Sequence, residues 1–120
     1  MWLGGVGSRS TSRNVYLALG VTDMRKSING LSVLVQEHLG EQLFDGSLFV
    51  FCNRARNRIK ILYWDENGFC LWLKRLEHAR FQWPVTEGEV RQIKREALEW
   101  LLAGLDVRQA HETLKFSIAG

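Results

Sequence analysis

The segment from Phe49 to Asp65 constrains the fold of this chain more than any other part of the sequence. It contains two apolar, strand-like stretches on either side of a tip that carries Arg54, Arg56 and Arg58, with Lys60 close behind. No acidic residue lies between Asp45 and Asp65. The pattern predicts a β-hairpin with uncompensated positive charge at one end, which is an arrangement suited to binding phosphate.

Composition limits the classes of protein to consider. The 120 residues fit one domain, and an apolar share of 46% is enough for a hydrophobic core. The net charge of +3 and the pI near 9.1 are only mildly basic, so the distribution of charge matters more than its sum. Cys52 and Cys70 have no metal-ligand spacing, and we expect both to be free thiols in a reducing cytosol. No stretch has the length of a membrane span or a signal peptide, which predicts a cytoplasmic protein without membrane contact.

The order of predicted elements indicates an α+β fold. The expected architecture is an antiparallel meander sheet with two main helices packed on one face. We predict a single domain over residues 14–105, a flexible arm at 1–13 and a C-terminal tail at 106–120, in which Leu114 to Ile118 is a candidate edge strand. The expected elements are a strand at 14–19, a helix that starts at Thr22 or Asp23 and ends near Gly40, strands at 47–52, 58–64 and 69–75, a short strand at 80–83, and a helix that ends near Gly104.

The second helix has a well-formed start and a broad apolar end. Thr86 and Glu89 have the spacing of a capping box, which predicts that the helix begins there. Leu98, Leu102 and Leu105 widen its apolar surface towards the C-terminus. We expect that surface to be covered by the tail or by a second subunit, so a homodimer is one arrangement that the sequence leaves open.

The register of the third and fourth strands remains open between two alternatives. An Asn67-Gly68 turn of type I′ pairs Lys60 with Arg75, and directly opposed like charges destabilise a sheet unless an anion lies over them. A wider, four-residue turn pairs Lys60 with Leu73 and removes the clash.

The basic residues are the candidate functional site. Basic loop tips also occur as solvated ends that keep sheets from pairing edge to edge. Arginine nevertheless matches phosphate bidentately, and the start of a helix favours an anion, so we favour contact with nucleic acid. The predicted nucleic-acid-binding residues are Arg54, Arg56, Arg58, Lys60, Lys74, Arg75, Arg80, Arg25 and Lys26.

Catalysis has little support in the residue pattern. The three histidines lie in no metal-binding motif, and there is no phosphate-cradling glycine loop or nucleophile elbow. Asp23, Asp65 and Glu99 can be drawn together as a metal triad, but their spacing does not demand it. We predict a protein that is not an enzyme, with no catalytic residues, no metal and no cofactor; a small metal-dependent nuclease is the remaining alternative.

Three blocks of sequence carry a family resemblance. They run from Val15 to Leu31, from Gly46 to Asp65 and from Leu73 to Pro84, and the patterns TDMRKxxxGL and KRLExxRFxWP within them are distinctive. Together they resemble the TnpB-type accessory protein, the second open reading frame, of the insertion-sequence family sixty-six. The resemblance spans residues 14–105. One departure is Ala79, where members of the family often have glycine.

The resemblance implies a bacterial mobile-element protein that is encoded beside a DDE-type transposase and takes part in transposition. It supplies no catalytic residues. The first hypothesis is an accessory protein that binds DNA at the transposon ends through the basic hairpin. The alternative is an adapter that docks the cognate transposase without touching DNA, with Leu98, Leu102 and Leu105 as the contact.

Overall fold

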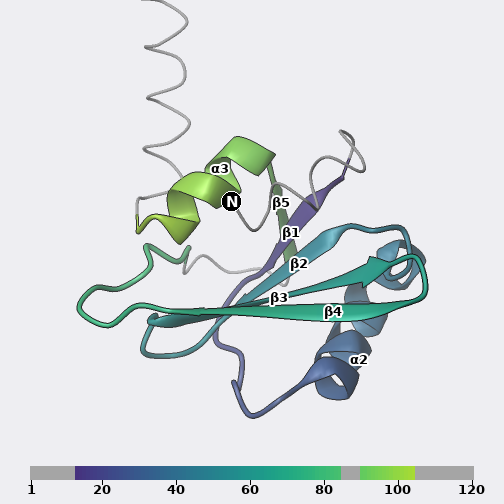
Figure 1. The fold of residues 1–120 in the computed structure, drawn as a ribbon, viewed down its shortest axis with the longest axis horizontal. Helices are drawn as coiled ribbons and strands as arrows, with labels where there is room; N and C mark the ends of the chain where they lie inside the picture. The colour runs from purple at the N-terminus through teal and green to yellow at the C-terminus, as the bar shows by residue number, and fades with distance from the viewer. Residues whose placement is uncertain (1–12, 85–89, 105–120) are drawn as a thin grey trace, which may run out of the picture.

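A five-stranded sheet with a helix on each side forms the body of the protein (Figure 1). The computed structural model describes residues 13–84 and 90–104. Its elements are β1 (Val15–Ala18), α2 (Ile28–Leu39), the 3₁₀ turn η1 (Gly40–Gln42), β2 (Leu48–Cys52), β3 (Arg58–Asp65), β4 (Gly68–Arg75), β5 (Val90–Ile93) and α3 (Arg95–Leu102). The α+β fold class predicted from the sequence is confirmed.

The sheet has the strand order β4-β3-β2-β1-β5. β3 pairs with β2 and with β4 in antiparallel fashion, but β1 pairs with β2 in parallel. A parallel pair requires a crossover connection, and α2 provides it between β1 and β2. The prediction of an entirely antiparallel meander is therefore corrected at its first strand.

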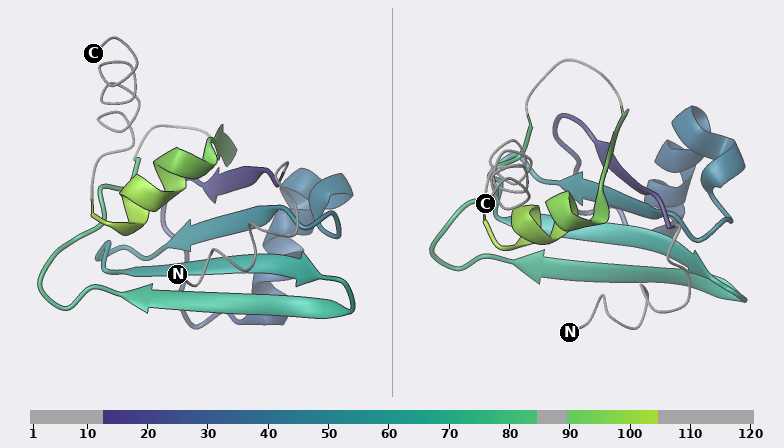
Figure 2. Two further views of the ribbon diagram at one scale, coloured as in Figure 1. Left: turned by 45° about the horizontal axis from the view of Figure 1, so that its top comes forward. Right: turned by 90° about the horizontal axis from the view of Figure 1, so that it is seen from above.

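The two helices lie on opposite faces of the sheet, which corrects the prediction that both pack on one face (Figure 2). Leu98 and Leu101 of α3 belong to one hydrophobic cluster, and Leu31 and Val35 of α2 belong to another. The reason lies in β2, where all five residues from Leu48 to Cys52 are buried. A strand covered on both faces is apolar at every position, so its sequence needs a helix on each side.

The chain before α2 is not helical, although helical spacing of apolar residues continues through it. The helix begins at Ile28 with Ser27 at the N-cap, and not at Thr22 or Asp23. In a longer helix, the main-chain carbonyl of Met24 would accept a bond from the fourth residue after it. Here that carbonyl accepts a hydrogen bond from the Lys60 ammonium group, so a contact from a distant strand replaces a helical bond.

The predicted start of the second helix is also corrected. Val90–Ile93 is the edge strand β5, with Val90 opposite Ala18 and Ile93 opposite Val15, and the helix begins at Arg95. Pairing with β1 outweighs the local helix signal, as tertiary context often does. The capping-box residues themselves lie outside the described residues.

Other predicted segments differ in their outcome. Residues 80–83 form no strand, but Phe81 and Trp83 are buried in the core cluster beside α3. The predicted arm and tail lie outside the described residues except for Arg13, whose Nη1 donates a hydrogen bond of 3.2 Å to the Gly46 carbonyl.

The β3–β4 turn settles the register. Asp65 pairs with Gly68, which leaves Glu66 and Asn67 as the loop and places Lys60 opposite Leu73. The φ angle is positive at Glu66 (55°) and not at Gly68, so the predicted Asn-Gly turn of type I′ is wrong. The alternative pairing of Lys60 with Leu73 is confirmed, but the loop has two residues and is not the wider, four-residue turn expected with it.

Candidate nucleic-acid interface

The loop between β2 and β3 is held by one asparagine. The Asn53 Oδ1 atom accepts hydrogen bonds from the main-chain N–H groups of Asn57 and Arg58, each at 3.0 Å. Its Nδ2 atom donates to Asn57 Oδ1 at 2.7 Å. Arg56 has a φ of 59°, a left-handed conformation that asparagine or glycine adopts more readily. The tip that carries Arg54 and Arg56 is thus a defined turn.

A second loop lies against this tip. The N–H of Leu76 donates to the Asn57 carbonyl at 2.8 Å, and the N–H of Phe81 donates to the Arg56 carbonyl at 2.6 Å. The Phe81 side chain is fully buried, which anchors the returning chain. Residues from both loops line a hollow of about 280 Å³. The structure therefore joins the hairpin tip and the segment from Lys74 to Arg80 at one end of the sheet, where β3 begins and β4 ends (Figure 1).

Five arginines gather on these two loops and the adjoining strand ends. Arg54 and Arg80 are exposed, and Arg56 and Arg58 are partly buried. Within the described part of the chain, the guanidinium groups of these four form no ion pair or hydrogen bond, whereas Arg75 Nε donates to Glu77 Oε2 at 2.8 Å. We call this group the basic end: Arg54, Arg56, Arg58, Arg75 and Arg80.

The observed register opposes two arginines directly. Arg58 at the start of β3 pairs with Arg75 at the end of β4. Ile59 and Ile61 belong to the core cluster on the α3 side, so by alternation Arg58 and Arg75 lie on the α2 side. The like-charge opposition that one predicted register assigned to Lys60 and Arg75 is present, but it falls on Arg58 and Arg75.

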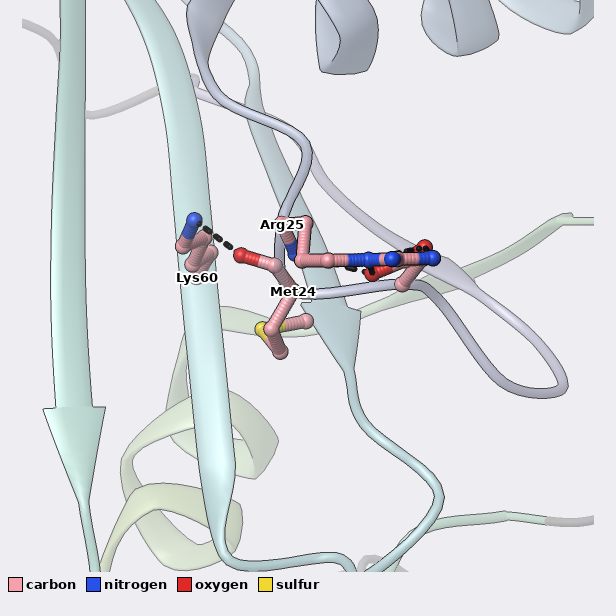
Figure 3. A network of polar contacts seen from close by, with 4 residues as sticks. Met24, Arg25 and Lys60 are labelled. Carbon is pink, nitrogen blue, oxygen red and sulfur yellow. Dashed lines mark hydrogen bonds and ion pairs between the residues drawn. The ribbon is translucent and has the colours of Figure 1, made fainter.

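Lys60 has a different task from the arginines. Its ammonium group donates a hydrogen bond of 2.8 Å to the main-chain carbonyl of Met24 (Figure 3). It donates a second hydrogen bond of 2.8 Å to the main-chain carbonyl of Lys26. These bonds fix the segment before α2 against β3. The ammonium group is therefore used by the fold, and we exclude Lys60 from the phosphate surface.

Lys74 is also used by the fold. Its ammonium group donates a hydrogen bond of 2.9 Å to the carbonyl of Leu102, the last residue of α3. The last carbonyls of a helix have no partner within the helix, and a cation there also interacts favourably with the helix dipole. This bond ties α3 to β4 and gives the Lys74 ammonium group a partner within the protein, so we leave Lys74 out of the basic end.

Arg25 and Lys26 precede α2 and do not lie in its first turn. The Arg25 guanidinium group is hydrogen-bonded to the Asp23 carboxylate, with 2.7 Å between Nη2 and Oδ2 (Figure 3). Hydrogen bonds from Arg25 lower the pKa of Asp23 to about 2. Arg25 is thus already paired, while Lys26 remains exposed.

The apolar end of the second helix is internal. Leu98 and Leu102 are 0% and 6% exposed, so they pack into the core and offer no docking surface; Leu105 lies outside the described residues. Sequence reasoning missed an apolar hollow of about 210 Å³ between α2 and the β1–β5 side of the sheet. Val21 and Leu34 are among its lining residues. In the sequence, the alternation of Tyr16 and Ala18 along β1 is the pattern that could have indicated this apolar surface.

A reactive cysteine, a metal site and a membrane-spanning helix are three further features to consider among residues 13–84 and 90–104. Burial raises the pKa of the Cys52 thiol to about 12, which makes it unreactive. No group of three or more His, Cys, Asp or Glu side chains there is placed to hold a metal ion. None of the helices in this part is long and apolar enough to span a membrane.

Fold and site together define a small α+β domain whose arginines gather at one end of a mixed sheet. The chain matches the family described as "IS66 Orf2 like protein" over residues 13–112, and it belongs to that family. It is therefore an accessory protein of an insertion sequence, and the resemblance found in the sequence is confirmed.

Two relatives come from Sinorhizobium fredii (strain NBRC 101917 / NGR234). The chain is 42% identical to "Uncharacterized protein y4hO" over 99 residues, which cover 82% of this chain and 86% of the relative. It is 32% identical to "Uncharacterized protein y4jC" over 97 residues, which cover 81% and 83%. No solved structure matches the chain.

Proposed function

We propose that this protein is a non-catalytic accessory protein of transposition that binds DNA at the transposon ends through the basic end. The observation that carries the proposal is the meeting of the two arginine-bearing loops, which are hydrogen-bonded to each other by their main chains. Lys26 is an additional, exposed cation for the same role. Lys60, Lys74 and Arg25 have partners within the protein and are left out.

The geometry of the basic end suits phosphate. Guanidinium groups donate two parallel hydrogen bonds to a phosphate, and such charge-assisted bonds are among the stronger ones in proteins. The tip that carries Arg54 and Arg56 is already fixed by Asn53, so little conformational entropy is lost when its arginines bind. Phosphate contacts position a protein on DNA without reading its sequence, so recognition of particular ends needs further contacts or the transposase.

A salt titration tests this proposal. Four phosphate contacts on duplex DNA, one of them shared by Arg58 and Arg75, give a slope of log affinity against log salt of about −3.6. Fluorescence anisotropy with a duplex from the element's ends measures that slope. The combined change Arg54→Ala, Arg56→Ala and Arg80→Ala is expected to reduce it to about −0.9.

A matched control separates local charge from total charge. Arg91→Ala removes one cation from an exposed position on β5, at the opposite edge of the sheet from β4, and is expected to leave the slope nearly unchanged. Wild-type protein without salt-sensitive binding would contradict the DNA-binding proposal. An equal loss in the control and in any single basic-end variant would contradict the assigned surface.

The second candidate function is an adapter that docks the cognate transposase. The apolar hollow beside α2 and the 56% exposure of Val21 at its lining favour a protein contact there, in place of the buried Leu98 and Leu102. Co-purification of the two proteins with and without nuclease distinguishes the candidates. Binding that survives nuclease and the three arginine substitutions, but is lost in Val21→Asp, supports the adapter.

A further inference from the structure

We propose that Arg58 and Arg75 form a discrete phosphate-binding site, and that the Glu77 carboxylate acts as an internal counter-ion that a phosphate displaces. The inference rests on the proposed function, because the natural ligand is a phosphodiester group of DNA. It goes further in naming one site within the basic end and one residue that limits its affinity.

The first observation is the register. Arg58 and Arg75 are direct partners in the antiparallel β3–β4 ladder, on the same face of the sheet. Side chains at such positions start about 5 Å apart, and opposed like charges destabilise the pair. Two guanidinium groups at this spacing can donate hydrogen bonds to different oxygens of one phosphate group.

The second observation is that the Glu77 carboxylate already pairs with one of the two opposed arginines. Glu77 is the one carboxylate in the two loops, residues 53–57 and 76–81. It lies two residues beyond Arg75 and accepts the Nε–H of that arginine at 2.8 Å. The Arg58 guanidinium group has no ion pair within the described residues. The free protein thus satisfies one arginine of the pair and leaves the other available.

The third observation concerns how easily Glu77 is displaced. The side chains of Arg75 and Glu77 are 55% and 61% exposed, and exposed ion pairs of this kind contribute little to stability. The hydrogen bond to Glu77 uses the Nε of Arg75, so the guanidinium group retains donors for a second acceptor. A phosphate forms hydrogen bonds with both arginines, whereas the Glu77 carboxylate bonds only one. The phosphate therefore has the more favourable free energy of interaction with the pair. Glu77 therefore weakens phosphate binding without blocking it.

The neighbouring cations do not offer an equivalent site. Lys60, the next residue on the same face of β3, bonds two carbonyls, and Lys74 bonds the end of α3. The opposed arginine pair is consequently the position where an anion relieves a repulsion that the fold itself leaves.

Titration with inorganic phosphate tests the site directly. NMR of the arginine Nε–Hε groups is expected to show saturable shifts at Arg58 and Arg75 in the wild type. Glu77→Gln is expected to tighten phosphate binding about two- to five-fold, because it removes an exposed competitor. Glu37→Gln removes the same charge from an exposed position on α2 and is expected to change binding little.

A double variant tests whether Glu77→Gln acts through its contact with Arg75 or only through the change in net charge. In an Arg75→Ala background, Glu77→Gln is expected to have no effect, because the two residues act through one contact. Circular dichroism melts show whether each variant is folded. Equal phosphate binding by Glu77→Gln and Glu37→Gln, or shifts that spare Arg58 and Arg75, would overturn the inference.

Duplex DNA separates this inference from the proposed function. If wild type binds duplex and Glu77→Gln tightens that binding about two- to five-fold, both are supported. Salt-sensitive binding that Glu77→Gln leaves unaltered contradicts the inference alone. Phosphate binding at Arg58 and Arg75 without duplex binding contradicts the proposed function and leaves the phosphate site standing.

Discussion

Two loops of this protein are fixed in contrasting ways. The tip between β2 and β3 is held by Asn53, which bonds residues four and five positions further along the chain. The segment before α2 is held by Lys60, whose partners lie 36 and 34 positions away. The first loop presents its arginines outward, while the second uses a cation to satisfy its own carbonyls. Positive charge close together in sequence therefore serves binding in one place and folding in the other.

A change at Lys60 tests the contrast between the two loops most directly, and we expect the largest loss in the free energy of unfolding there. Lys60→Met removes two charge-assisted hydrogen bonds and leaves the carbonyls of Met24 and Lys26 without that partner. Hydrogen bonds to charged groups contribute roughly 1.5–3 kcal/mol, so we expect a loss of about 2–3 kcal/mol in the free energy of unfolding. Urea denaturation measures this.

The neighbouring Lys26 supplies the control. Lys26→Met removes an exposed ammonium group and is expected to change the free energy of unfolding by less than about 0.5 kcal/mol. A Lys60→Met protein as stable as this control, with weakened DNA binding, would mean that Lys60 belongs to the phosphate surface after all.

Removing the asparagine of the other loop gives an intermediate effect. Asn53→Ala deletes three local hydrogen bonds at the tip, and we expect a loss of about 1–2 kcal/mol together with weaker DNA binding. Asn53→Asp keeps the acceptor for the two main-chain N–H groups and should recover part of the stability. If Asn53→Ala unfolds as the wild type does, the tip is not held in the way described.

The smallest expected effect is on pH dependence, at the ion pair in the loop before α2. The folded-state pKa of Asp23 is lowered to about 2 from an ordinary value of 3.8, so its contribution to stability is present above pH 3.8 and is lost as the pH falls towards 2. Carboxylate NMR should give a midpoint near 2, and Arg25→Ala should return it towards 3.8. A midpoint already near 3.8 in the wild type would show that the pair does not form.

The difference between the loops also explains what the sequence could predict. The hairpin and its arginine tip were predicted because apolar alternation and a run without acids are local signals. The sequence did not predict the start of α2 at Ile28, because the Lys60 bond that holds the preceding segment out of the helix comes from a strand 36 residues away. β5 was missed for a related reason: Val90–Ile93 has a helical spacing, and pairing with β1 decides its conformation.

The candidate site was predicted in part for the same reason. Arginine density identified Arg54, Arg56 and Arg58, and the loop contacts bring Arg75 and Arg80 to them. Nothing in the residue types distinguished Lys60 and Lys74 from these cations. Their partners are main-chain carbonyls, which every residue has and which leave no mark in the sequence.

The sequence by itself determined the α+β class, the hairpin, the family and the presence of an arginine cluster, because these depend on residue type and spacing along the chain. The tertiary structure decided the parallel β1–β2 pair, the placement of the helices on opposite faces and the register that opposes Arg58 to Arg75. It also decided which cations remain available for a ligand. These features depend on which distant segments share a hydrophobic core and satisfy each other's main-chain groups, and local patterns do not encode that choice.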